Sequence, residues 1–336
     1  MSIPFQVEVE LAHDNPSENN ERLILFELIF LGTSASAPSV HRGLSAQVIK
    51  HDEHRFLIDC GEGTQRQILK SGMGFKHLNR ILITHSHLDH ILGLGGLLST
   101  LMRWETIGDL EIAAGEYALD RIRDLLLGVV LRGLRPPIDL RFRKVEPGML
   151  YDEPGFTVEA FPVRHRGPDC FGYVFQERSH RPFLVEKAEA LGIPPGPWRR
   201  DLVNGLEARL PDGRTIYPEQ VLGDVRRGTR LVYIGDTGHT SDLLPFAMGA
   251  DTLVIEATYL KTEEDMAQKF AHLTAEKAAE LARDAHVGSL ILTHLSRRYR
   301  ERDVLDEARA VFPNTRIARD FDTYQIKRGS ATIVER

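Results

Sequence analysis

Nine short runs of aliphatic and aromatic residues recur along the chain, and most are separated by segments whose apolar residues follow a helical spacing. Their lengths and their β-branched and aliphatic content are typical of buried strands. The nine runs are residues 23–32, 45–51, 55–61, 80–85, 156–163, 172–177, 230–236, 252–258 and 289–294. Near the C-terminus, Thr274 is the expected N-cap of a helix over 275–286, and a further helix is predicted over 303–312. Strands that alternate with helices predict an α/β architecture.

Several predicted strands end in an ionisable residue. These residues are Asp59, His85, Asp236, Glu256 and His294. In α/β sheets the ligand crevice lies outside the carboxyl ends of the strands. We therefore expect these groups, although distant in the sequence, to gather in one cleft.

The strand pattern is interrupted between residues 177 and 230. Residues 191–205, LGIPPGPWRRDLVNG, hold three prolines and three glycines around Trp198. This composition predicts an inserted arm over 178–228, with a loop packed on the body as the simpler alternative. Residues 1–22 are polar and predict an N-terminal extension, so that one large domain spans 23–336.

The composition adds no element to the predicted fold, but it excludes some classes of protein. With 336 residues, 42% hydrophobic and 27% charged, the chain is typical of a soluble globular protein. A net charge of −6 argues against a broadly basic surface, so nucleic-acid binding would need local patches. Candidate patches lie at 132–144, 198–200, 226–230 and 297–302, and a solvated face is the simplest interpretation of each.

Two cysteines, Cys60 and Cys170, are too few for a disulfide framework or a zinc site built on several thiolates. Metal chemistry would need histidine and carboxylate ligands. The N-terminus has no basic segment followed by an apolar stretch, and no run approaches the roughly 20 apolar residues of a membrane helix. We expect a cytoplasmic protein without a membrane anchor.

The strongest chemical signal is the segment 84–90, Thr-His-Ser-His-Leu-Asp-His, which follows a predicted buried strand. In an extended backbone His85 and His87 point to the same side and can converge on one ion, with Asp89 and His90 on the following loop. Imidazole and carboxylate are the usual zinc ligands, with copper and non-haem iron as alternatives. Between two ions a carboxylate can bridge, and a shared hydroxide becomes a nucleophile near neutral pH.

The pattern His85-x-His87-x-Asp89-His90 resembles the signature of the metallo-β-lactamase superfamily, which implies an αββα four-layer sandwich. Further stretches resemble the ribonuclease Z family within it. They are FLGTSASAP (30–38), IDCGEGTQRQ (58–67), ITHSHLDHILGLGGLL (83–98), GDT (235–237) and LTHLSRRY (292–299). The resemblance extends over residues 23–328.

The resemblance implies two zinc ions per chain and names their ligands. His85, His87 and His165 would hold one ion, Asp89, His90 and His294 the other, and Asp236 would bridge them. Asp89 would also orient or deprotonate the attacking water. Glu256 and His272 match the family's Glu-Ala-Thr and His-x-Thr loops and suggest a relay with His272 as general acid. Ser296 and Arg298 match a segment that could contact substrate phosphate.

The implied activity is an endonuclease that removes 3′ trailers from precursor tRNA by metal-hydroxide attack on the phosphodiester. The arm resembles an exosite that grips tRNA from the partner subunit of a homodimer, with Arg199 and Arg200 as its cations. The arm lacks the usual lysines, the loop 38–43 reads PSVHRG where PxKxRN is common, and Leu88 replaces a common glycine. The alternative is a related hydrolase of small phosphodiesters or sulfate esters.

Overall fold

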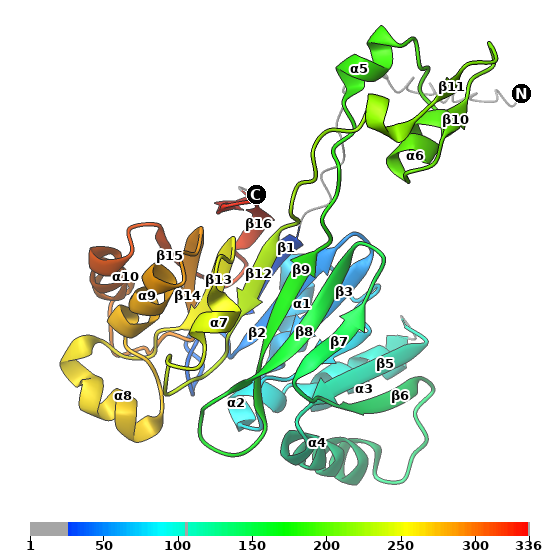
Figure 1. The fold of residues 1–336 in the computed structure, drawn as a ribbon. Coiled ribbons are helices and arrows are strands. Elements are labelled where there is room, and N and C mark those ends of the chain that lie inside the picture. The colour runs from blue at the N-terminus through cyan, green and yellow to red at the C-terminus, as the bar shows by residue number, and fades with distance from the viewer. Residues whose placement is uncertain (1–25, 105–106, 335–336) are drawn as a thin grey trace, which may run out of the picture.

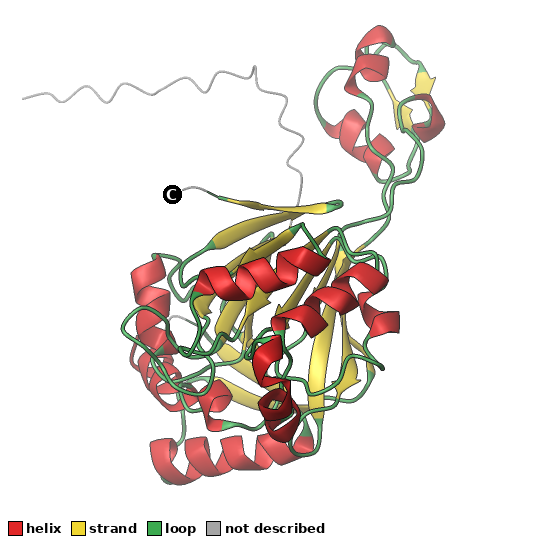
Figure 2. Ribbon diagram, turned by 90° about the vertical axis from the view of Figure 1, so that its left-hand side faces the viewer, coloured by secondary structure: helices red, strands yellow, loops and turns green. Residues whose placement is uncertain are grey.

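Two twisted β-sheets packed face to face, with helices on both outer faces, form the body of the chain (Figures 1 and 2). The computed structural model describes residues 26–104 and 107–334. The predicted αββα sandwich is confirmed. The predicted N-terminal extension, residues 1–22, lies outside the described residues.

The first sheet has eight strands, and β1 is antiparallel to both of its neighbours, while β3 to β6 run parallel. In spatial order its strands are β17 (Ser330–Ile333), β16 (Thr323–Lys327), β1 (Phe26–Gly32), β2 (Ala46–His51), β3 (His54–Ile58), β4 (Arg80–Leu82), β5 (Asp109–Ala114) and β6 (Asp139–Lys144).

The second sheet has seven strands, of which β12 to β15 run parallel, while β9 is antiparallel to both β8 and β12. In spatial order its strands are β15 (Thr315–Ile317), β14 (Ser289–Thr293), β13 (Thr252–Glu256), β12 (Arg230–Tyr233), β9 (Cys170–Glu177), β8 (Phe156–Val163) and β7 (Gly148–Asp152).

Three apolar layers hold these elements together. Phe30 and Tyr324 of one sheet and Tyr173 of the other belong to the cluster between the sheets. A second cluster packs the first sheet against α1 (Thr64–Ser71), α3 (Leu94–Trp104), α4 (Glu116–Arg123) and the π-helix η1 (Asp124–Leu131). A third packs the other sheet against α7 (Leu244–Ala247), α9 (Ala275–Asp284) and α10 (Glu301–Val311). The remaining short body helices are α2 (Leu88–Ile91), η3 (Lys261–Glu263) and α8 (Glu264–Phe270).

The C-terminal helices agree with the sequence prediction. Thr274 caps α9, and its side-chain oxygen accepts a hydrogen bond from the Lys277 backbone N–H at 3.2 Å. Such an N-cap bond satisfies one of the free amides of the first helical turn. Helix α10 begins at Glu301, two residues before the predicted start.

Several predicted strands extend beyond the carboxyl ends of the observed strands, and the sequence predicted fewer strands than the structure has. Strand β4 ends at Leu82 and β12 at Tyr233, so the ionisable residues that follow lie on loops beyond the sheet edge. The edge strand β6 has the sequence DLRFRK, which the charge pattern assigned to a basic surface patch. Its alternating side chains are only partly buried, so it lacks the apolar run that marks a central strand.

Residues 178–229 leave the second sheet after β9 and return at β12. They project from the sandwich as an arm, which consists of a stalk of two neighbouring chain segments and a compact head (Figures 1 and 2). The head of the arm has its own small core around Ile193, Leu202 and Val221, with Trp198 packed against it. Its elements are α5 (Val185–Ala190), α6 (Pro197–Val203), β10 (Ala208–Arg209), β11 (Thr215–Ile216) and η2 (Pro218–Gln220).

No helix among residues 26–104 and 107–334 is long and apolar enough to cross a membrane.

Candidate metal centre

The histidine motif lies where the carboxyl ends of strands from both sheets meet. After β4 the chain passes through Thr84 and His85, and α2 begins at Leu88. Asp89 and His90 therefore lie on a short helix, and the predicted loop is wrong at this point. The His90 N–H bonds to the His87 carbonyl at 3.1 Å and the Leu92 N–H bonds to the Leu88 carbonyl at 2.9 Å, so these residues form a helical turn.

One group of ligand atoms gathers His85, His87, His165 and Asp236. The Nδ1 of His87 lies 2.9 Å from Nε2 of His85 and 3.2 Å from Nε2 of His165. The Oδ2 of Asp236 lies 3.6 Å from the His85 nitrogen and 3.7 Å from the His165 nitrogen. Nitrogens that share a tetrahedral zinc at about 2.0 Å lie roughly 3.3 Å apart, so this spacing fits one ion.

A second group gathers Asp89, His90 and His294. The Oδ2 of Asp89 lies 3.7 Å from Nε2 of His90 and 3.6 Å from Nε2 of His294. Asp236 adjoins this group as well, because its Oδ2 lies 3.5 Å from Nε2 of His90. Asp236 is thus within reach of both groups, which is the position of a bridging carboxylate.

Three of these atoms are buried and have no hydrogen-bond partner among the described residues: Nε2 of His90, Oδ1 of Asp236 and Nε2 of His294. A buried polar atom without a partner is costly, and such atoms in a native protein call for an ion or another ligand. The donor set is imidazole and carboxylate, which suits zinc. The residues present therefore fit the metals that the sequence implies.

Three of the candidate ligand histidines have their other ring nitrogen held by the protein. Nδ1 of His90 lies 2.7 Å from Oδ2 of Asp59, and Nδ1 of His165 lies 2.7 Å from the Ala271 carbonyl oxygen. Nδ1 of His294 lies 3.0 Å from the Thr258 hydroxyl. Outer partners of this kind fix the tautomer and the orientation of a metal-binding imidazole.

Asp59 was recognised in the sequence only as a polar strand end and received no role. It is fully buried, and besides His90 it accepts a hydrogen bond from the Thr84 backbone N–H at 2.8 Å. Its position directly after a buried strand was the available signal. Asp59 and His294 also adopt left-handed backbone conformations, with φ of 57° and 54°. Non-glycine residues held in this region are enriched at functional sites.

Glycine permits the close packing under the motif. A Cβ atom on Gly93 would lie 2.0 Å from the Gly61 carbonyl oxygen, so the segment after α2 can approach the loop after β3 only without a side chain at this position. The Leu88 side chain is 52% exposed, so it lies outside this close contact.

The protonation states separate the histidines into two kinds. Burial, together with the neighbouring histidines, lowers the pKa of His87 to about 4 and holds the pKa of His85 well below its ordinary value. Burial also opposes the charged form of His90, but Asp236 and Asp59 outweigh it and raise the pKa of His90 well above its ordinary value. Metal binding requires neutral imidazoles, so most of this site is ready for it and His90 must lose a proton.

Glu256 and His272 form a pair beside Asp236. Nδ1 of His272 lies 2.9 Å from Oε1 of the fully buried Glu256 and 4.0 Å from Oδ2 of Asp236. Glu256 also accepts hydrogen bonds from the Thr237 backbone N–H at 2.8 Å and from the Thr258 hydroxyl at 2.5 Å. Burial disfavours the charged imidazolium, but the charge and hydrogen bond of Glu256 prevail and raise the pKa of His272 to about 9.

The predicted substrate contacts are less uniform. Ser296 lines a cavity of about 270 Å³ beside the loop 34–42. Arg298 is 53% exposed and lies 3.4 Å from Glu263. On the arm, far from this cavity in the chain, Arg200 is exposed, whereas the Arg199 guanidinium donates to the Ile193 carbonyl oxygen at 2.7 Å.

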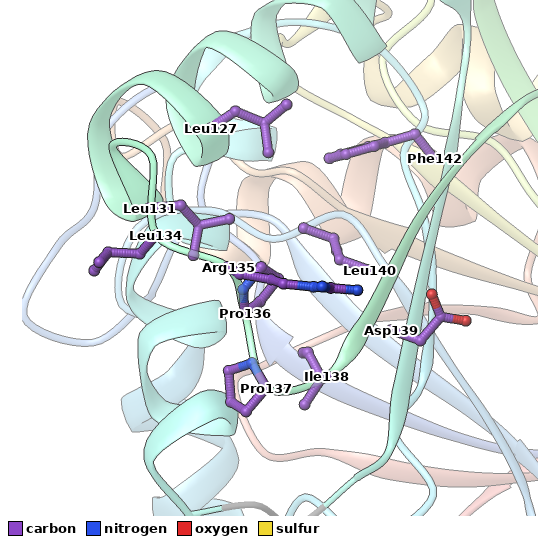
Figure 3. Close-up of a pocket in the computed structure, with 10 residues that line it drawn as sticks. All are labelled: Leu127, Leu131, Leu134, Arg135, Pro136, Pro137, Ile138, Asp139, Leu140 and Phe142. Atoms are coloured by element: carbon purple, nitrogen blue, oxygen red, sulfur yellow. The ribbon is translucent and has the colours of Figure 1, made fainter.

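A cavity of about 540 Å³ lies elsewhere, between η1 and β6 (Figure 3). Leu127, Leu131 and Phe142 face it, and it shares no residue with either ligand group. Its lining offers no cluster of histidines or carboxylates.

Comparison with known proteins identifies the family. The family model described as Anti-Pycsar protein Apyc1 matches residues 26–135, and that described as Beta-lactamase superfamily domain matches residues 204–295. Ribonuclease Z of Bradyrhizobium diazoefficiens is 48% identical over 298 residues, which cover 89% of this chain and 99% of the relative. Ribonuclease Z of Archaeoglobus fulgidus is 40% identical over 307 residues, 90% of this chain and 98% of the relative.

Solved structures agree. Human tRNase Z, short form, is 25% identical with a TM-score of 0.64, and the match covers 90% of this chain and 99% of that one. A metallo-β-lactamase-fold protein of Bacillus subtilis, 17% identical, matches with a TM-score of 0.64 over 90% of this chain and 99% of that one, which shows the fold. The chain therefore belongs to the ribonuclease Z family of metal-dependent hydrolases with the metallo-β-lactamase fold.

Proposed function

We propose that the chain is a dinuclear zinc phosphodiesterase that removes 3′ trailers from precursor tRNA. One arrangement carries the proposal: Asp236 lies between two groups of imidazole and carboxylate ligands, and the His272–Glu256 pair lies beside it. Two ions would stabilise the charge that develops at the phosphate, and a protonated imidazole can protonate a poor leaving group.

In this proposal each ligand group would hold one zinc: His85, His87 and His165 the first, and Asp89, His90 and His294 the second, with Asp236 within reach of both. Zinc in these positions would supply Lewis-acid stabilisation of the phosphodiester and activation of the attacking water. The hydrogen bonds that the imidazoles donate to Asp59, Ala271 and Thr258 keep the ligand nitrogens directed at the centre.

Asp89 orients the attacking water and accepts its proton. Its Oδ2 accepts a hydrogen bond from the Ser36 backbone N–H at 3.0 Å, which fixes the carboxylate. Burial opposes ionisation of Asp89, but the neighbouring His294 and the charge of His90 hold its pKa below the ordinary value. The carboxylate is therefore ionised at neutral pH and can accept a proton.

His272 protonates the departing 3′ oxygen. Its Nδ1 is held by Glu256, so Nε2 is the nitrogen left to donate. A pKa of about 9 keeps the imidazolium charged at neutral pH, which suits a general acid. Ser296 and Arg298, on the loop after β14, are the residues we assign to the substrate phosphate.

Precursor tRNA as the substrate is supported by the relatives, which are named ribonuclease Z, and by the human neighbour, named tRNase Z. The arm supports it too. The arm leaves the second sheet at the carboxyl end of β9 and returns at the amino end of β12, and these two ends are neighbours because the strands are antiparallel. The candidate ligands His85, Asp236 and His294 instead follow the carboxyl ends of β4, β12 and β14. The arm thus points away from its own centre, and we propose a homodimer in which it holds tRNA bound at the partner subunit.

The test uses metal-replete protein with a 3′-extended precursor tRNA and, in parallel, bis-p-nitrophenyl phosphate. We expect cleavage of both, with a 3′-hydroxyl on the tRNA product. Cleavage of the small diester alone would reject the tRNA assignment and favour the small-ester hydrolase. Inactivity on both, in protein that holds zinc, would reject the phosphodiesterase itself.

A further inference from the structure

Two carboxylates outside the metal centre, one fully buried and one partly buried, flank the strand by which the arm rejoins the body. Glu177 ends β9, and Asp251 immediately precedes β13. Strand β12 lies between β9 and β13 in the sheet. We call residues 177–178 and 227–230 the root of the arm. Neither carboxylate contacts the metal ligands, and the proposed mechanism uses neither.

Asp251 binds the returning strand with both of its oxygens. Its side chain is fully buried, and the Arg227 guanidinium donates to Oδ1 at 2.6 Å and to Oδ2 at 2.9 Å. The Arg230 backbone N–H donates to Oδ2 at 2.7 Å, and the Gly329 backbone N–H donates to Oδ1 at 2.6 Å. A bidentate guanidinium pair constrains direction as well as distance. Asp251 therefore ties the end of the arm to two separate parts of the body.

Glu177 holds the same strand from the other side. Its Oε2 accepts a hydrogen bond from the Thr229 backbone N–H at 2.9 Å, and its Oε1 lies 3.2 Å from Nε2 of His51. The His51 ring packs against Phe26 and Phe156 in the core between the sheets, with ring centroids 4.8 and 4.5 Å apart. Glu177 thus connects the arm to the packed core between the two sheets.

The stalk of the arm is itself held together, so fixing its base also restricts the head. Its two segments exchange backbone hydrogen bonds between His180 and Arg226, at 3.0 and 2.8 Å. The Gly223 N–H bonds to the Pro182 carbonyl at 2.9 Å. At the root the chains approach so closely that a Cβ on Gly228 would lie 2.3 Å from the Glu177 carbonyl oxygen. A paired stalk that is fixed at its base has one preferred direction.

We propose that Glu177 and Asp251 are positioning residues that fix the direction of the arm relative to the body, and thereby set the affinity for a substrate that the arm must hold. The second half of this inference rests on the proposed function. Figures 1 and 2 show why direction matters: the head lies at the end of a narrow stalk, so a small rotation at the root displaces it widely. If the arm is free to move, ordering it on binding costs free energy, and the affinity that its contacts with the substrate provide falls.

The direct test measures the arm, without any substrate. Spin labels are introduced with Glu207→Cys on the head and Asp120→Cys on α4, both at exposed positions, while the native Cys60 and Cys170 are buried. Labelled chains are diluted with unlabelled chains so that only distances within one chain are measured. We expect one narrow distance distribution, which broadens in Asp251→Asn and in Glu177→Gln. The matched control is Asp212→Asn, in the head, whose carboxylate accepts side-chain and backbone hydrogen bonds from Arg214 and from no other described residue.

The kinetic test separates positioning from folding. Asp251→Asn should raise KM for precursor tRNA by about tenfold with kcat retained, and leave hydrolysis of bis-p-nitrophenyl phosphate unchanged. Loss of zinc or of small-diester activity in Asp251→Asn would mean that the fold is damaged. The test then uses Arg227→Gln, which removes the same ion pair from a side chain that is 45% exposed. Unchanged distance distributions in Arg227→Gln and Glu177→Gln would overturn the proposal. If the wild-type protein does not cleave precursor tRNA, the proposed function fails, and the distance measurement still decides the role of the root.

Discussion

Oδ2 of Asp59 lies 2.7 Å from Nδ1 of His90, and both side chains are buried. This contact determines which His90 nitrogen faces the candidate metal centre, because Nδ1 is engaged and Nε2 has no hydrogen-bond partner among the described residues. Asp59 is in turn fixed by Thr84, one residue before the histidine motif. The strand β3 thus orients a ligand that belongs to the chain segment after β4.

Asp59→Asn should weaken zinc binding by about 10 to 100-fold, the usual effect of losing an outer partner of a metal ligand. The amide can no longer act as the anionic acceptor that holds His90 in the required tautomer. Zinc affinity is measured by competition with a chromogenic chelator. Asp120→Asn, on an exposed face of α4, is the control. An affinity equal to that of the wild type would mean that Asp59 does not orient His90.

Zinc binding should release about one proton per chain near neutral pH. Asp236 and Asp59 raise the pKa of His90 against the effect of burial, so this imidazole is protonated in the metal-free protein, whereas the lowered pKa values of His85 and His87 leave those rings neutral. Affinity should therefore rise with pH below the His90 pKa. Calorimetry in buffers of different ionisation enthalpy counts the protons. A binding enthalpy that is independent of the buffer would contradict this assignment.

His272→Ala should retain zinc and lose about 10² to 10⁴-fold of its turnover on precursor tRNA, whose leaving oxygen needs a proton. Hydrolysis of bis-p-nitrophenyl phosphate should fall much less, because nitrophenolate leaves unaided. His286→Asn, at an exposed histidine, is the control. Loss of zinc would instead identify His272 as a ligand, a role that its proximity to Asp236 and His294 permits.

The two arm arginines should behave differently. Arg200→Ala should weaken binding of precursor tRNA and reduce the slope of log affinity against log salt by about one, as expected for the loss of one phosphate contact. Arg199 donates to the Ile193 carbonyl and lies over the Phe183 ring, so Arg199→Ala should lower the stability of the head. Binding at several salt concentrations and thermal unfolding distinguish them. An unchanged salt slope in Arg200→Ala would exclude Arg200 from the interface.

The sequence predicted which side chains gather as candidate metal ligands better than it predicted their surroundings, for physical reasons. His85 and His87 are close in the chain and follow a strand, so their convergence needs only the two-residue period of extended backbone. The partner of His90 is 31 residues away, and only the packed sheet decides that Asp59 and not another polar strand end faces it. Arg227 belongs to a basic stretch that is typical of a solvated face, yet Asp251 binds it bidentately. Pairings between distant charged groups are set by tertiary structure.

Elemental analysis of the purified, metal-replete protein tests the central claim most directly. The two ligand groups that share Asp236 predict two zinc ions per chain. His294→Ala should retain the group of His85, His87 and His165 and reduce the content to about one ion. Two ions in the wild type and one in the variant are the predicted result. A zinc content near zero in the wild type, with thermal stability unchanged by added zinc, would contradict the account.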